Sequence, residues 1–62
     1  RMGVAKADTE KEARLKKKRL EKVFPNMKGQ LIIAYETGEG MFHGMWVVWL
    51  DSGLKQPGYL KP

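Results

Sequence analysis

The chain has 62 residues, a net charge of +5 and no cysteine. A chain of this length supports one small domain, because it buries only about 60% of the surface that its unfolded form exposes. The lack of cysteine excludes disulfides and thiolate metal sites, and no apolar run approaches the ~20 residues that cross a bilayer.

Positive charge is concentrated at the start of the chain. The first 24 residues hold nine Lys or Arg against four Asp or Glu, whereas the remaining residues hold three of each sign. A cationic arm joined to a neutral module predicts an anionic partner, with nucleic acid as the leading candidate. We divide the single domain into a disordered tail (1–8), a basic helix (9–24) and a small β-rich module (25–62).

A helix is predicted over residues 9–23. The sequence from Thr9 to Glu12 has the pattern of a capping box, in which these two residues exchange side-chain to backbone hydrogen bonds. Good helix formers follow without Gly or Pro. Pro25 then disfavours helical geometry at Phe24, so the helix is expected to end there.

The apolar residues of this helix gather near its end. Leu20, Val23 and Phe24 have the spacing of one helical face. We therefore expect the C-terminal turns to pack on the rest of the domain, and the N-terminal half to be exposed. The same three residues are candidates for an interface.

Four consecutive cations, at residues 16–19, cover most of the helix circumference. Lysine and arginine release counterions from a polyanion and so give salt-sensitive binding that is independent of sequence. The same run could serve as a nuclear localisation signal, or it could be a solvated helix face. The residues expected to contact phosphates are Arg14, Lys16, Lys17, Lys18, Arg19 and Lys22.

Beyond the helix, the pattern is typical of strands. Residues 31–35 and 45–50 are rich in β formers. A glycine-rich turn at 37–40 separates them, and the second strand is expected to be broken or bulged at Gly44. Residues 54–60 could add an edge strand. The predicted fold is α+β, with a basic helix before an antiparallel sheet of two to three strands, SH3-like in size and charge or completed by oligomerisation.

The strand over 45–50 is apolar on both faces. A single helix covers only one face of a small sheet, so the other face needs a partner chain or a second layer. We therefore expect self-association or docking into a larger protein complex. Trp46 and Trp49 are the candidate interface residues, with Trp46 as the anchor.

Aromatic residues could also stack on unpaired bases. No basic residue is interleaved with them in the hairpin, however, where phosphate partners would be expected. We therefore favour a role in the core or in an oligomer interface. The aromatic residues concerned are Tyr35, Phe42, Trp46, Trp49 and Tyr59.

Catalytic and metal motifs are weak in this sequence. His43 is the single histidine, and the nearest carboxylates lack ligand spacing, so a surface or loop position is expected. Residues 51–53 (Asp-Ser-Gly) could suggest a nucleophile, but this combination is common in turns. The glycines at 38 and 40 do not precede a helix, as a phosphate loop would require. We expect no metal, no cofactor, no small-molecule substrate and no enzymatic activity.

One segment resembles a known repeat. Residues 35–46 (Tyr-Glu-Thr-Gly-Glu-Gly-Met-Phe-His-Gly-Met-Trp) are similar to a membrane-occupation-and-recognition repeat. Such repeats occur in tandem, whereas this segment occurs once. The resemblance therefore assigns no family.

These observations favour a small, basic, intracellular protein, cytoplasmic or nuclear, that binds DNA or RNA without catalysis. In this interpretation the cationic helix contacts phosphates, and the hairpin holds the domain or a homo-oligomer together. The alternative is a protein-interaction or structural subunit that docks through its Trp-rich hairpin. No membrane partner is expected, because the helix has too little apolar surface for insertion.

Overall fold

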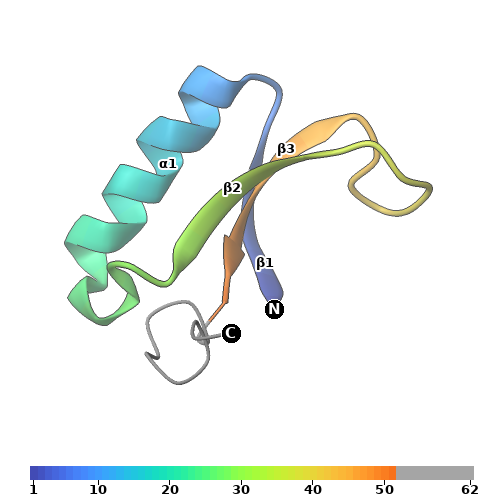
Figure 1. Ribbon diagram of the computed structural model, residues 1–62. Helices are drawn as coiled ribbons and strands as arrows, with labels where there is room; N and C mark the ends of the chain where they lie inside the picture. The colour runs from blue at the N-terminus through green and yellow to red at the C-terminus, as the bar shows by residue number, and fades with distance from the viewer. Residues whose placement is uncertain (52–62) are drawn as a thin grey trace, which may run out of the picture.

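The computed structural model describes residues 1–51, which form one antiparallel sheet with a helix on one face (Figure 1). This arrangement confirms the predicted α+β fold with a small antiparallel sheet. The predicted edge strand at 54–60 lies outside the described residues. The elements in chain order are β1 (Met2–Ala7), α1 (Glu10–Val23), the short 3-10 helix η1 (Pro25–Met27), β2 (Leu31–Glu36) and β3 (Met45–Leu50).

Strand β3 lies at the centre of the sheet, in the order β1-β3-β2, and is antiparallel to both neighbours. Strands β1 and β2 therefore run parallel to each other, and α1 is the crossover that joins them. Val48 of β3 lies opposite Ala5 of β1 and Ile33 of β2. These three residues share the face that packs against the helix.

The N-terminal segment forms a strand, so the prediction of a disordered tail over 1–8 was wrong. Its periodicity was hidden because a bulge between Gly3 and Ala5 breaks the alternation of side chains. Glycine and alanine also have low β propensity. The segment is ordered by pairing with β3, whose second edge would otherwise leave backbone groups unpaired.

The boundaries of α1 follow the predicted signals. Thr9 is the N-cap, and its hydroxyl accepts a hydrogen bond of 3.2 Å from the backbone N–H of Glu12. The Glu12 carboxylate accepts from the same hydroxyl at 3.2 Å, rather than from the Thr9 backbone. At the other end, the N–H of Phe24 donates to the carbonyl of Leu20. The helix predicted over 9–23 is confirmed.

The most completely buried residue of α1 is Ala13, which has no exposed surface and belongs to the core with Ala7, Leu31 and Val48. The N-terminal half is therefore also anchored on the sheet, whereas we predicted that it would be exposed. The short connection from β1 into α1 holds this end near the sheet.

The C-terminal end of α1 is less buried than predicted. Leu20 packs against the core, but Val23 and Phe24 are 62% and 48% exposed. Their predicted packing on the domain was wrong, because the approach of the helix to the sheet is set at Ala13, well before these residues. Val23 and Phe24 remain candidates for contact with another molecule.

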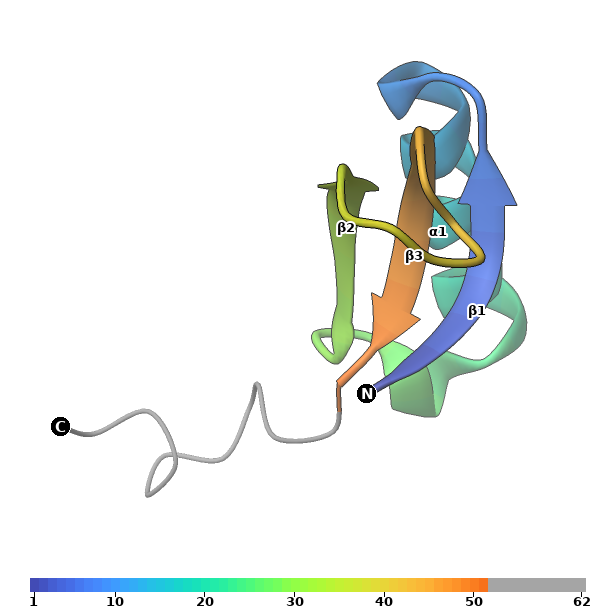
Figure 2. The same cartoon turned by 90° about the vertical axis from the view of Figure 1, so that its right-hand side faces the viewer.

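The face of the sheet away from α1 is covered in part by the loop between β2 and β3. Figure 2 shows this loop crossing in front of the sheet, with α1 behind. Phe42 of the loop packs edge-on against Trp49 at 5.7 Å between ring centroids. A Cβ at Gly3 would come within 3.3 Å of both rings, so glycine provides the space they occupy. Val47 on this face has no exposed surface.

The same loop replaces the early part of the predicted second strand. Residues 41–44 form a turn, and β3 begins at Met45. Gly44 adopts a φ of 76°, which side chains other than glycine rarely tolerate. Its N–H donates to the carbonyl of Glu36 at 2.8 Å and closes the loop.

The contact at Ala13 can be tested by enlarging the side chain. We expect Ala13→Leu to lower the free energy of unfolding by about 1–3 kcal/mol, because the buried site has no room for more methylene groups. Alanine and leucine have similar helix propensities, so the change reports packing. Urea unfolding followed by circular dichroism measures the effect.

The matched control is Leu15→Ala on the opposite side of the same helix, where Leu15 is 52% exposed. This change is expected to stay within about 0.5 kcal/mol of the parent protein. Equal losses in the two variants would contradict the close contact at Ala13.

Candidate functional site

Three of the predicted phosphate-binding cations are engaged within the fold. Arg14 forms an ion pair with Glu10, and its Nε lies 3.0 Å from the carboxylate. The ammonium of Lys17 lies 3.0 Å from the carboxylate of Glu21.

Lys16 donates at 2.7 Å to the backbone carbonyl of Lys6 in edge strand β1. The side chains of Lys16 and Lys17 border the sheet-facing side of α1, and both residues are half-buried. Their positions explain why they find partners within the fold.

The other cations of α1 are exposed. They include three that we predicted to contact phosphates, namely Lys18, Arg19 and Lys22. Lys11 is also exposed, although we did not predict it as a phosphate contact. Within residues 1–51, none of these four side chains forms an ion pair or a hydrogen bond. We call them the outer cations.

Their spacing explains their shared exposure. Lys11, Lys18 and Lys22 are separated by seven and four residues, so they project from the side of the helix opposite Ala13. They extend along about 16 Å of helix at 1.5 Å per residue. This spacing was the signal that could have identified Lys11.

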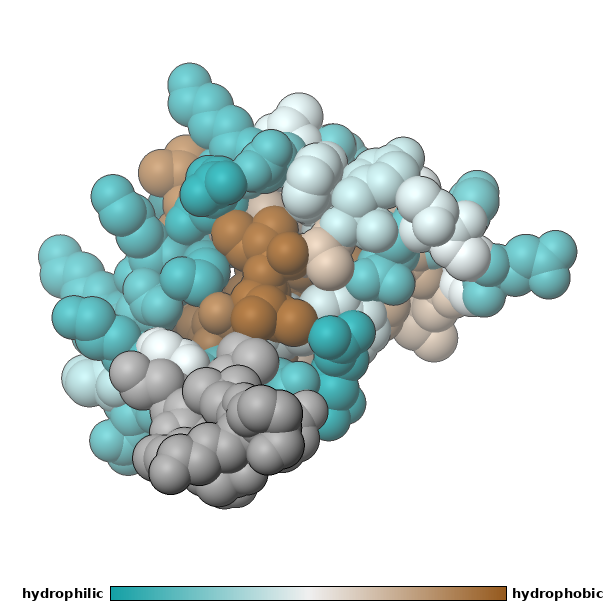
Figure 3. Space-filling model, in the orientation of Figure 1, coloured by the Kyte–Doolittle hydropathy of each residue, from teal (hydrophilic) through white to brown (hydrophobic). Residues whose placement is uncertain are grey.

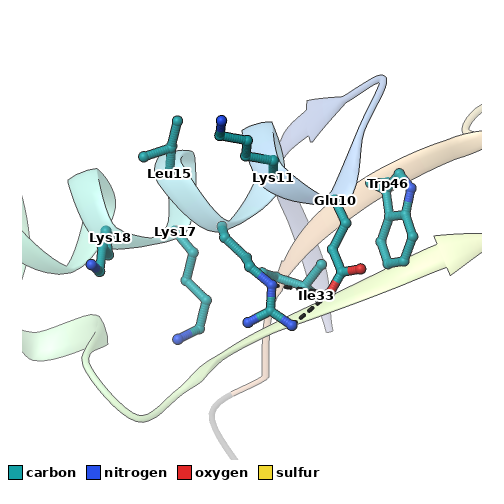
Figure 4. Close-up of a pocket in the computed structure, with 8 residues that line it drawn as sticks. Glu10, Lys11, Leu15, Lys17, Lys18, Ile33 and Trp46 are labelled. Atoms are coloured by element: carbon teal, nitrogen blue, oxygen red, sulfur yellow. Dashed lines mark hydrogen bonds and ion pairs between the residues drawn. The ribbon is translucent and has the colours of Figure 1, made fainter.

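A hollow of about 560 Å³ lies between α1 and the β2 side of the sheet. Figure 3 shows an apolar area over β2, beside the hydrophilic side chains of the helix. In Figure 4, the ring of Trp46 lies at one end, beside Glu10, and Lys17 and Lys18 lie toward the other. The lining residues are Glu10, Lys11, Arg14, Leu15, Lys17, Lys18, Ile33 and Trp46.

Trp46 lies on the helix-facing side of the sheet, where it packs against the core and lines this hollow. Tyr35 lies directly opposite it on β2, with the ring centroids 5.3 Å apart and the planes tilted by 58°. Tyr35 is 48% exposed. The fold therefore places an aromatic pair beside the cations of α1, although the two groups are far apart in the sequence.

Trp49 lies on the opposite face and is held by contacts within the chain. Its indole N–H donates to the carboxylate of Glu36 at 2.9 Å. The guanidinium of Arg1 lies 5.3 Å from the ring centroid, in addition to the contact with Phe42. Trp46 and Trp49, both predicted as interface residues, therefore belong to different surfaces.

A second, smaller hollow of about 310 Å³ lies beside the C-terminal end of α1. Leu20, Val23 and Phe24, which we predicted as interface residues, line it together with Ala5, Lys16 and Arg19. The sequence-based interface set is thus divided among three places in the fold.

His43 lies in the exposed loop before β3, as predicted. Its Nδ1 is 2.9 Å from the carbonyl oxygen of Gly38. Over residues 1–51 the structure contains no group of three His, Asp or Glu side chains that could hold a metal ion. In the same part of the chain, no helix has the length and apolar character needed to cross a membrane.

Comparisons of the chain with protein-family models, curated proteins and solved structures found no match.

The division between engaged and outer cations predicts different effects on stability. We expect Lys17→Gln to lower the free energy of unfolding by about 0.5 kcal/mol, because it removes the ion pair with Glu21, one helical turn further along α1. Lys18→Gln removes an outer cation and is expected to leave stability unchanged. Urea unfolding of both variants measures the difference.

A double-mutant cycle with Glu21→Gln isolates the pair itself. In the Glu21→Gln background, the loss caused by Lys17→Gln should disappear. The same loss in both backgrounds would show that Lys17 stabilises the helix by some means other than this ion pair.

Proposed function

We propose that this protein binds nucleic acid through the outer cations of α1. Lys11, Lys18, Arg19 and Lys22 contact phosphates, and the sheet serves as the scaffold that presents the helix. One observation carries this proposal: four exposed cations on one helix have no acidic partner within residues 1–51. Binding alone is proposed, without a chemical step.

The pairing of the helix charges favours this assignment. Glu10 and Glu21 neutralise Arg14 and Lys17 on one flank of the helix, toward β2. The cations of α1 without an acidic partner in residues 1–51 therefore include those of the outer side. A phosphate that contacts an outer cation breaks no ion pair, so the gain from counterion release is not offset by a lost interaction.

The length of the cationic stripe suits a polynucleotide. Its extent of about 16 Å matches about five steps of a nucleic-acid strand at 3.4 Å each. Four phosphate contacts imply a slope of log affinity against log salt near −3.6 on duplex DNA and about −2.8 on a single strand. Such binding is independent of sequence, because phosphates carry no base information.

A protein-interaction role is a second candidate, and a separate observation favours it. Val23 and Phe24 are large, exposed apolar residues that line the smaller hollow with Leu20. A second copy of the chain or a larger complex could cover them. This role predicts weak sensitivity to salt and strong sensitivity to Val23→Ser and Phe24→Ser. Nucleic-acid binding predicts the reverse.

The proposed function is tested by removing two outer cations. We expect Lys18→Gln combined with Lys22→Gln to weaken binding to a short fluorescent oligonucleotide. The salt slope should become shallower by about 1 for each lysine removed, because each change deletes one phosphate contact. Fluorescence anisotropy at low and physiological salt measures both quantities.

The matched control is Lys6→Gln combined with Lys28→Gln, which makes the same change in net charge at exposed residues outside α1. In this control, the slope of log affinity against log salt should equal that of the parent protein. Equal weakening in both double variants would show that net charge alone governs binding. No binding of the parent protein at low salt would overturn the proposed function.

A further inference from the structure

The larger hollow combines two kinds of group that the sequence keeps apart. Trp46 and Ile33 come from the sheet, whereas Lys11, Arg14 and Lys18 come from the helix. Its volume of about 560 Å³ lies in the range of small-molecule sites. The hollow thus has an aromatic ring at one end and helix cations along its length. Grooves that hold single-stranded nucleic acid combine these two kinds of group, since the ring stacks on a base and the cations contact the phosphates of the strand.

We propose that this hollow receives an unpaired base, so that the protein prefers single-stranded over double-stranded nucleic acid. The inference rests on the proposed function and deepens it. Phosphate contacts with the outer cations position the strand, and one base leaves the strand to stack on Trp46. Tyr35, which is 48% exposed and whose ring is tilted by 58° from that of Trp46, contacts a neighbouring base.

The ring of Trp46 is suited to stacking because its position is already fixed. Part of Trp46 packs against the core, and Tyr35 holds a second side at 5.3 Å between centroids. The residue nevertheless remains half-buried and lines the hollow. Little freedom is therefore lost when a base covers the remaining surface.

The cations of the hollow are continuous with the phosphate-binding face. Lys11 and Lys18 are outer cations that also line the hollow. Glu10 is the one acidic lining residue, and Arg14 neutralises it. The side chains of this pair are 69% and 46% exposed. Because Arg14 stays with Glu10, the phosphate contacts at the hollow come from Lys11 and Lys18.

Duplex DNA cannot use this site in the same way. In a duplex the faces of the bases are stacked on each other, and a protein reaches only their edges in the grooves. A base must be unpaired to lie flat against Trp46. A duplex can therefore contact the outer cations but leaves the hollow empty, which gives the preference for single strands.

Fluorescence of a single tryptophan tests the inference directly. Trp46 and Trp49 are the two tryptophans of the chain, so Trp49→Phe leaves Trp46 as the sole reporter. We expect a single-stranded oligonucleotide to quench the emission of this variant. An abasic oligonucleotide of the same length and charge should bind about tenfold more weakly, since it lacks the base that stacks, and should cause no quenching.

Two further variants control for position and for folding. Trp46→Phe keeps only Trp49, which lies on the other face of the sheet, and its emission should not change on binding. Tyr35→Ala alters an exposed residue and should weaken binding of the base-bearing strand several-fold without affecting the abasic strand. Circular dichroism confirms that each variant retains the helix.

The outcomes separate this inference from the proposed function. Equal affinity for base-bearing, abasic and duplex oligonucleotides, without quenching of Trp46, would overturn the base site and leave phosphate binding in place. Quenching of Trp49 instead of Trp46 would also overturn it. No binding to any of these oligonucleotides would overturn both proposals.

Discussion

Strand β3 must be paired along both edges and covered on both faces. Its edges are satisfied by β1 and β2. One face is covered by α1, and the other is covered in part by the loop that brings Phe42 onto Trp49. Nearly every element of this small domain is thus explained by its contact with one apolar strand. The chain's own loop thus covers part of the face over which we expected a partner chain.

The orientation of the helix follows from the contact at Ala13. Because this residue is fully buried against the sheet, rotation of α1 about its axis is fixed. Fixed rotation determines which cations reach solvent: Lys11, Lys18 and Lys22 point outward, while Lys16 and Lys17 lie at the border of the sheet. A packing contact between small side chains therefore decides the electrostatic pattern on the outer surface.

The two proposals use adjoining parts of one surface. The outer cations supply phosphate contacts without breaking ion pairs, and the hollow beside them adds an aromatic ring from the sheet. Trp49 and its contacts with Arg1, Glu36 and Phe42 remain on the other face. The second tryptophan therefore stabilises the fold in our proposal, while Trp46 meets the ligand.

The sequence by itself determined the elements with local signals. The cap at Thr9, the helix end before Pro25 and the apolar run of β3 predicted the helix and the main hairpin. These features depend on residues close together in the sequence: a local hydrogen bond at the cap, a steric clash before proline, and a run of β-forming side chains. Only the tertiary structure decided that residues 2–7 form a strand, which cations remain unpaired, and that Trp46 lies beside them. These properties depend on contacts between distant residues, and the spacing of residues along the chain does not encode such contacts.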